Sequence, residues 1–309
     1  GRRRRSPAGP AQVIRVRLAH RLPYSADGIL AHLALTAVPG VEEFDPSTTT
    51  YRRTLRLPHG SGVVAVTPRA DHVEGAIRLS DLRDLPSAVA RVRWLLDLDA
   101  DPVAVDTHLA EEPALRRVIA RDPGRRVPRC TDGDELALRV VLGQQISTAA
   151  AARHAARLVS EVGERLDEPD GTLTHLFPTA GAVAGAPDRC LRLPDRRRRT
   201  LRTLAEHLAR GELRLDPAAD RDEAAAHLAE LPGVGPWTAS VIAMRALGDP
   251  DAFLADDLGV RRAAVQLGLP DTPARLVERS ARWRPWRAYA TQYLWAALDH
   301  PVATLRRQT

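Results

Sequence analysis

One stretch of the chain has a spacing of glycines and prolines that decides the fold, Glu230-Leu-Pro-Gly-Val-Gly-Pro-Trp-Thr-Ala-Ser-Val-Ile-Ala-Met244. Its pattern predicts an amphipathic helix over 221–230, a tight turn, and a second helix that begins after Gly235. Two glycines separated by one apolar residue allow the amide groups of the turn to point outward together. Amides at a helix start bind phosphate through their N–H groups and the helix dipole. An ordinary corner between two helices is the alternative, and Leu-Pro-Gly-Val-Gly favours the phosphate site.

The segment 221–245 resembles a helix–hairpin–helix, an element that binds the DNA backbone without reading bases. We expect the backbone contacts to come from the turn and the start of its second helix, at Gly233, Val234, Gly235, Trp237 and Thr238. At both glycines a Cβ is expected to block the approach of phosphate and to disfavour a positive φ.

Two adjacent carboxylates, Asp256 and Asp257, follow the hairpin after a short apolar segment. An Asp between such a segment and a helix is commonly an N-cap. Taken alone, Asp257 would be interpreted in that way, but its position after the hairpin favours a role in chemistry. We expect Asp256 to be a cap or a loop anchor.

The composition excludes several classes of protein. With 44% hydrophobic and 27% charged residues among 309, the chain can bury a core and is not a disordered chain. It contains no lysine, so no side-chain amine can form a Schiff base. Two cysteines, Cys130 and Cys190, are too few for a four-cysteine zinc site or an iron–sulfur cluster, and a reducing setting is expected. No apolar run is long enough for a membrane span.

The first part of the chain predicts a small α/β unit. Residues 1–12 are expected to be a disordered tail or linker. Residues 13–102 are expected to form an N-terminal domain with an antiparallel sheet, because Val13–Leu18 and Tyr51–Leu57 alternate between apolar and polar side chains. A helix is predicted over 86–97.

After Asp101-Pro102 the strand signals disappear, and we predict helices separated by proline and glycine, including 103–121 and 172–176. The predicted fold class is α+β, with an N-terminal sheet-and-helix domain followed by an all-helical body of two lobes. The first lobe is predicted to combine 103–127 with 249–309, and the second to cover 128–248.

The hairpin followed by Asp257 resembles the helix–hairpin–helix DNA glycosylase superfamily, and within it the bacterial 3-methyladenine DNA glycosylase II type. Further segments match that type in order and spacing: Leu142-Gly-Gln-Gln-Ile-Ser147, Phe253-Leu-Ala-Asp-Asp257, Trp283-Arg-Pro-Trp286-Arg-Ala-Tyr289 and Trp295. The resemblance implies a monofunctional glycosylase that flips alkylated purines out of double-stranded DNA. It also implies Asp-assisted hydrolysis of the N-glycosidic bond, in base excision repair.

The resemblance implies roles for individual residues. Asp257 matches the catalytic carboxylate, and Gln145 matches the position of the DNA wedge. The base pocket is expected to be formed by Trp237, Trp295, His32, Val241 and Leu258. The last three stand where the family usually has aromatic residues, which makes this pocket less aromatic. Core packing is the alternative for the two tryptophans, and a polar helix-start residue is the alternative for Gln145.

The lyase branches of the superfamily carry a lysine just after the hairpin, where this chain has Trp237. We therefore expect no lyase activity. No cofactor is required, although the resemblance allows a structural monovalent cation at the backbone carbonyls of Ala229, Leu231 and Gly233. The block Arg196–Arg199 is interpreted either as a solvated face or as a second contact to the DNA backbone.

Two other functions stay open from the sequence: a non-catalytic helix–hairpin–helix DNA-binding module, and a glycosylase for another damaged or mismatched base. The expected setting is a cytoplasmic, nucleoid-associated monomer without membrane contact. The arginine-rich start at Arg2–Arg5 fits either a chain fused behind an N-terminal regulatory methyltransferase domain or a trimmed product.

Overall fold

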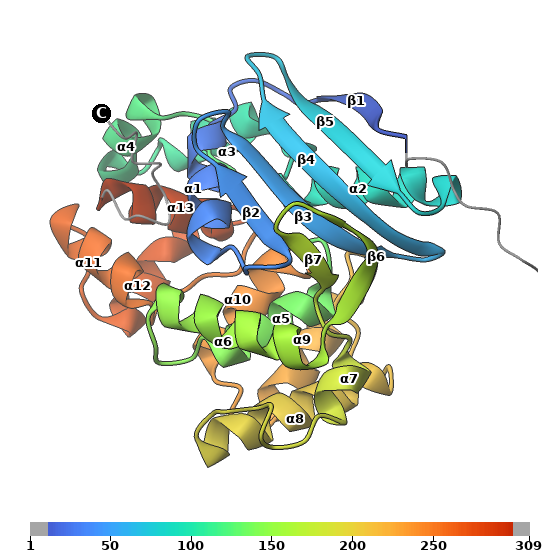
Figure 1. Cartoon of the computed structure of the whole chain (residues 1–309). Helices are drawn as coiled ribbons and strands as arrows, with labels where there is room; N and C mark the ends of the chain where they lie inside the picture. The colour runs from blue at the N-terminus through green and yellow to red at the C-terminus, as the bar shows by residue number, and fades with distance from the viewer. Residues whose placement is uncertain (1–11, 299–309) are drawn as a thin grey trace, which may run out of the picture.

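A five-stranded antiparallel sheet forms the N-terminal part of the computed structural model, which describes residues 12–298 (Figure 1). The strand order is β1-β5-β4-β3-β2. The strands are β1 (Ile14–Ala19), β2 (Glu42–Asp45), β3 (Thr50–Leu57), β4 (Gly60–Pro68) and β5 (His72–Leu79). Side chains alternate between the two faces of a strand, and in β5 every second residue from Val73 to Leu79 is buried. The predicted antiparallel sheet is therefore confirmed.

Two helices cover one face of this sheet, α1 (Ala26–Thr36) and α2 (Leu85–Leu95), the latter after a short 3₁₀ turn, η1 (Leu82–Asp84). Ile29 of α1 and Val92 of α2 are buried in one cluster with Tyr51 and Leu55 of β3. This apolar layer fixes α1 relative to the sheet, which matters because α1 also reaches the site described below.

A two-stranded hairpin, β6 (Glu164–Asp170) and β7 (Leu173–Leu176), lies within the helical part of the chain. The helix predicted over 172–176 is therefore wrong, as is the absence of strands after residue 102. The strands carry many polar side chains and one proline, so they show no alternation that a sequence pattern could detect. Gly171 turns the hairpin with φ +64°, and both Thr174 and His175 donate their N–H groups to the carbonyl of Gly40.

Helices make up the rest of the body, which has the predicted α+β class. They are α3 (Pro102–Leu109), α4 (Pro113–Arg121), α5 (Gly133–Leu142), α6 (Thr148–Val162), α7 (Ala180–Ala184), α8 (Asp195–Ala209), α9 (Arg221–Glu230), α10 (Pro236–Arg245), α11 (Leu258–Gln266), α12 (Pro273–Ser280) and α13 (Arg287–Ala297), with a 3₁₀ turn η2 (Ala281–Trp283). The helix predicted over 103–121 is two helices, because Pro113 begins a new one.

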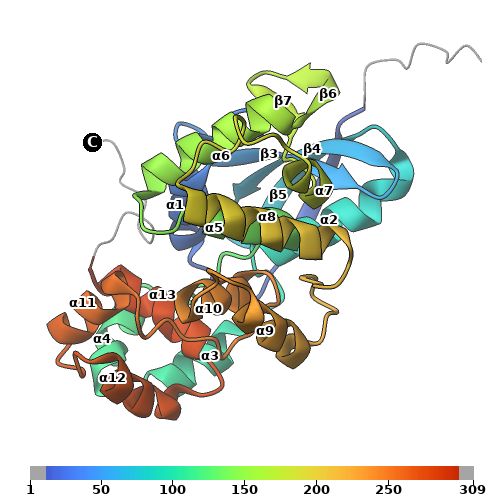
Figure 2. The ribbon, with the colours of Figure 1, turned by 90° about the horizontal axis from the view of Figure 1, so that it is seen from below.

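The helices form two groups, one in which α3 and α4 lie beside α11, α12 and α13, and one that contains α5 to α8 (Figure 2). The exact limits of the two lobes stay a prediction. Within residues 12–298, no helix combines the length and apolar character that crossing a bilayer requires.

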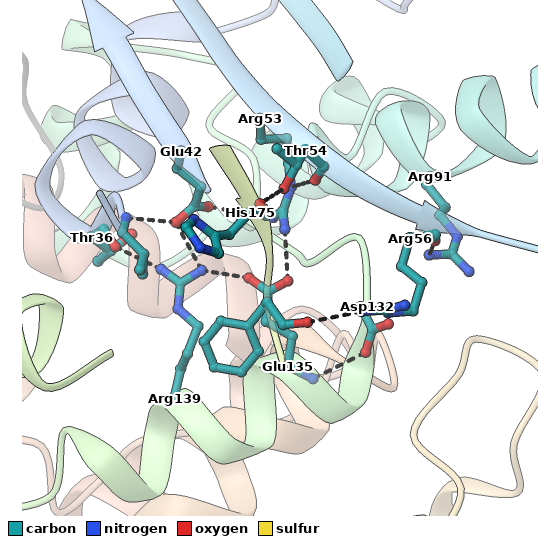
Figure 3. Close-up of polar contacts among 12 residues, drawn as sticks. Thr36, Glu42, Arg53, Thr54, Arg56, Arg91, Asp132, Glu135, Arg139 and His175 are labelled. Atoms are coloured by element: carbon teal, nitrogen blue, oxygen red, sulfur yellow. Dashed lines mark hydrogen bonds and ion pairs between the residues drawn. The ribbon is translucent and has the colours of Figure 1, made fainter. Parts of the chain in front are cut away.

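A buried network of charges joins the sheet to the helical body (Figure 3). Arg53 of β3 contacts Glu135 of α5 at 2.7 Å and Glu42 of β2 at 3.3 Å. Arg139 of α5 contacts the same two carboxylates at 2.8 and 2.9 Å. Burial alone would raise the pKa of Glu42, but Arg139 and Arg53 lower it. Each charge is therefore held between two of the opposite sign.

We expect Arg53→Met to lower the free energy of unfolding by about 3 kcal/mol, because it leaves buried carboxylates short of a partner. The measurement is urea denaturation at neutral pH. Arg15→Met is the matched control, since Arg15 pairs with Glu74 at 3.0 Å on the exposed side of the sheet and its loss should change little. Equal effects of the two substitutions would contradict a structural role for the network.

Candidate active site

The hairpin between α9 and α10 places its two glycines in different environments. Gly233 has φ +88°, and a Cβ there would lie 1.9 Å from Oγ1 of Thr200 in α8. Gly235, the N-cap of α10, has φ −90°, and a Cβ there would meet no atom within 4 Å. The expected positive φ is therefore found at Gly233 and is wrong for Gly235. At Gly235 the remaining reason for glycine is the open space beside it, through which a phosphate can approach the backbone.

The first turn of α10 presents backbone amides outward. Pro236 occupies the first helical position, and Trp237 and Thr238 follow it, where N–H groups have no partner one turn earlier in the helix. Val234, predicted to contact the DNA backbone, instead donates its N–H to the carbonyl of Leu231 and buries its side chain. Val234 thus fixes the turn. Gly235 is exposed and Trp237 is partly exposed, whereas Thr238 is buried and its Oγ1 accepts from Gln144, so its contact to the DNA backbone stays a prediction.

The hairpin is also tied to the loop between α5 and α6. The side-chain amide of Gln144 donates to the carbonyl of Gly233 at 3.0 Å and to Oγ1 of Thr238 at 3.1 Å. Sequence reasoning missed Gln144, because nothing marks it apart from its neighbour Gln145.

The backbone carbonyls proposed for a cation are partly in use, since that of Leu231 accepts from Val234 and that of Gly233 from Gln144. The cation at Ala229, Leu231 and Gly233 stays a prediction. Across residues 12–298, His, Cys, Asp and Glu side chains form no group of three or more suited to a metal ion.

Asp257 is both the N-cap of α11 and the meeting point of two tryptophans. Its Oδ1 accepts from the amide of Val260 at 2.9 Å and from Nε1 of Trp295 at 2.9 Å. Its Oδ2 accepts from Nε1 of Trp237 at 3.2 Å. The capping interpretation is confirmed, and the chemical role of Asp257 stays a prediction. Asp256, expected to be a cap or anchor, is exposed and makes no hydrogen bond within the described part of the chain, so that expectation is wrong.

A cavity of about 430 Å³ opens beside this carboxylate, at the junction of α1, α5, α6, α10, α11 and α13. The structure brings all the predicted pocket residues into its wall: Trp237, Trp295, His32, Val241 and Leu258. Leu258 is 59% exposed and marks the mouth, whereas His32 is 6% exposed and belongs to the interior. The two tryptophans line the cavity and also pack, partly buried, against the hydrophobic core of the helical body. Trp283, by contrast, is fully enclosed and donates to Glu112.

Charged side chains form part of the otherwise mainly apolar wall of the cavity, which sequence reasoning did not anticipate. All four members of the charge network, Glu42, Arg53, Glu135 and Arg139, contribute to it, together with Arg245. Burial lowers the pKa of Arg245 to about 10, and its Nε donates to the carbonyl of Pro128 at 2.7 Å. These residues are far apart in the sequence, and only the packing of the sheet on α5 and α10 assembles them.

Gln145 lies in the loop between α5 and α6, exposed and with φ +58°. Such a conformation is uncommon for a residue with a side chain and is found where surrounding contacts impose it. The anchoring of Gln144 to the hairpin supplies that constraint. Gln145 is therefore held outward in a fixed backbone geometry next to the hairpin.

The arginine block begins α8, directly next to the hairpin, because Thr200 of α8 packs against Gly233. Arg198 pairs with Asp195 at 2.7 Å and with Asp188 at 3.4 Å. Arg196, Arg197 and Arg199 make no ion pair with any residue that the structure describes.

Two family models match the chain: the AlkA N-terminal domain over residues 15–132 and the HhH-GPD superfamily base excision DNA repair protein over residues 138–288. A relative from Mycobacterium tuberculosis, named probable bifunctional transcriptional activator/DNA repair enzyme AlkA, is 51% identical over 297 residues. The match covers 96% of this chain but only 60% of that relative. DNA-3-methyladenine glycosylase 2 of Escherichia coli is 34% identical over 278 residues, which cover 88% of this chain and 94% of the relative.

The solved 3-methyladenine DNA-glycosylase from Archaeoglobus fulgidus has the same fold, with a TM-score of 0.76, 23% identity, and coverage of 91% of this chain and 97% of that one. The first family model covers the N-terminal sheet and its helices, and the second covers the helical body with the hairpin. The match to the E. coli protein extends over both parts. The chain belongs to the HhH-GPD superfamily of base excision DNA repair proteins, within the group that carries the AlkA N-terminal domain.

Proposed function

We propose that the chain is a monofunctional DNA glycosylase that excises alkylated purines of the 3-methyladenine type. The observation that carries the proposal is the carboxylate of Asp257, held by the indoles of Trp237 and Trp295 in the wall of a cavity next to the glycine turn of the hairpin. The names of the M. tuberculosis and E. coli relatives, a DNA repair enzyme and a 3-methyladenine glycosylase, support it.

The chemistry requires a fixed negative charge. When the N-glycosidic bond breaks, its electron pair leaves with the base and positive charge develops on the sugar. Asp257 stabilises that charge and positions the water that adds to C1′. The cationic alkylpurine becomes neutral as it takes the electron pair of the broken bond, and the water that forms the new C1′–O bond releases its proton to solvent. Three N–H donors fix the orientation of the carboxylate, so it does not need to reorganise as the charge develops.

Alkylated purines are cationic in DNA and leave easily, so the pocket mainly has to hold them. The faces of Trp237 and Trp295 attract a cationic flipped base. Val241 and Leu258 supply apolar contact instead of further aromatic rings. Retention of the base therefore depends on two aromatic rings and on the charged groups in the cavity wall.

The DNA backbone is proposed to bind at the exposed Gly235 and at the amides of Trp237 and Thr238 in the first turn of α10, while Gln145 fills the space that the flipped base leaves. Arg196, Arg197 and Arg199 extend this surface, since they lie on the helix that packs against the hairpin. Because these amides and arginines would contact phosphates and not bases, we expect binding that does not depend on the base sequence.

The absence of lysine supports hydrolysis without strand cleavage, because β-elimination needs an amine nucleophile. We further propose a monomer that acts on the chromosome at the nucleoid, in the cytoplasm. The name of the M. tuberculosis relative also describes a transcriptional activator, which supports the proposal that this repair unit works joined to an N-terminal regulatory methyltransferase domain.

The proposed function is tested by incubating the chain with methylated double-stranded DNA and identifying the released bases. We expect free alkylpurines and an intact abasic strand that breaks only when alkali is added. Binding without base release would favour the non-catalytic module. Release of only oxidised or mismatched bases would favour the other glycosylase class, and strand breakage without alkali would contradict the monofunctional mechanism.

Asp257→Asn is expected to lower the single-turnover excision rate by a factor of about 100 or more, because it removes the charge that faces the developing cation. DNA affinity, measured by fluorescence anisotropy, should stay close to that of the wild type. Asp256→Asn is the matched control, since this neighbour is exposed and outside the cavity. Loss of excision in the control but not in Asp257→Asn would contradict the assignment.

The two hairpin glycines are expected to respond differently to alanine. Gly233→Ala should lower both the Tm and the affinity for DNA, because the new Cβ collides with Thr200 and the φ is positive. Gly235→Ala should leave the Tm unchanged and weaken binding to all DNA sequences alike, because its Cβ points toward the phosphate. Equal melting temperatures for the two variants, or loss of affinity for one sequence only, would contradict this account.

A further inference from the structure

His32 is a buried polar side chain for which the proposed mechanism has no use. It lies on α1, is 6% exposed, and forms part of the wall of the same cavity as Asp257. Neither Nδ1 nor Nε2 has a hydrogen-bond partner in the described part of the protein. Buried polar groups are nearly always paired, so an imidazole with two unpaired nitrogens in a cavity wall indicates a partner from outside the chain.

We propose that His32 determines specificity by hydrogen-bonding the edge of the flipped base that lies farthest from the sugar. This inference rests on the proposed function. The sugar must sit at the mouth of the cavity, where Asp257 is partly exposed and Leu258 is 59% exposed. A purine attached there projects its ring inward, and its N1 and its C6 substituent are the atoms farthest from the glycosidic bond. His32 belongs to the interior wall that these atoms approach.

The surroundings keep the imidazole in the form that this role requires. Burial, together with the positive charges of Arg245 and Arg139, holds the pKa of His32 well below its ordinary value. A neutral imidazole has one donor and one acceptor, whereas the imidazolium has two donors. It can therefore pair with either a carbonyl or an N–H of the base, without the repulsion that an imidazolium would exert on a cationic lesion.

The contact requires the imidazole ring to move, because both ring nitrogens lie under neighbouring atoms. The torsion about the Cβ–Cγ bond, which is broad for histidine, is the degree of freedom that this movement uses. The backbone at His32 stays in place while the ring rotates, because its carbonyl accepts a hydrogen bond from Oγ1 of Thr36 at 2.8 Å. Sites that pair with a polar group of their substrate reject the analogue that lacks it.

The experiment compares two uncharged bases that differ only at this edge, hypoxanthine and unsubstituted purine, each placed in the same DNA duplex. Hypoxanthine carries the C6 oxygen and the N1–H that purine lacks. The readout is the ratio of their single-turnover excision rates, in which effects common to both substrates cancel. We expect His32→Phe to lower the hypoxanthine-to-purine ratio about tenfold, the loss of roughly one hydrogen bond. His32→Gln, which keeps a donor and an acceptor, should hold the ratio within about threefold of wild type.

His20→Phe is the matched control. The ring nitrogens of His20 also lack partners in the described residues, but His20 stacks on Tyr24 and does not line the cavity. Its substitution should leave the ratio unchanged. An unchanged ratio in His32→Phe, or an equal shift in His20→Phe, would overturn the proposal. Release of alkylated purines but not hypoxanthine by the wild type would overturn it as well, whereas release of no base from any of these DNAs would overturn the proposed function itself.

Discussion

The carboxylate of Asp257 is the point on which the site depends, because it connects three helices through three hydrogen bonds. Trp237, in the first turn of α10, connects the carboxylate to the hairpin. Trp295 connects it to α13, and the amide of Val260 connects it to α11. The indole nitrogens face the carboxylate while the rings form the wall of the cavity. A single acidic group thereby holds the hairpin turn, the two tryptophan rings and the start of α11 in fixed positions relative to one another.

The cavity also depends on a second set of charges at its inner end. Arg53 and Arg139 sit between Glu42 and Glu135, and this network links the sheet to α5. Buried ion pairs contribute less to stability than their contacts suggest, because removing charges from water opposes the attraction. Here they place charged groups in the otherwise mainly apolar wall of the cavity.

The elements that depend on local sequence could be predicted. The glycines and prolines around Gly233 predicted the hairpin, and the helix predicted over 221–230 has those bounds in the structure. Asp257 and the two tryptophans could be singled out because they match functional positions of the glycosylase family that the sequence resembles. The hairpin β6–β7 could not be found, since its polar strands are fixed by contacts such as those to Gly40 and not by a periodic pattern. The charge network and the contact of Gln144 with the hairpin could not be predicted from the sequence either, because only tertiary packing brings their partners together.

The central claim is that Asp257 acts through its charge on a cationic sugar. The most direct measurement is the affinity for DNA that carries a positively charged pyrrolidine at the abasic position, compared with an uncharged tetrahydrofuran there. The wild type is predicted to prefer the cation by a factor on the order of 100, as expected of a site complementary to the transition state. Asp257→Asn is predicted to lose that preference while binding the uncharged analogue as before, and a variant that still prefers the cation would contradict the account.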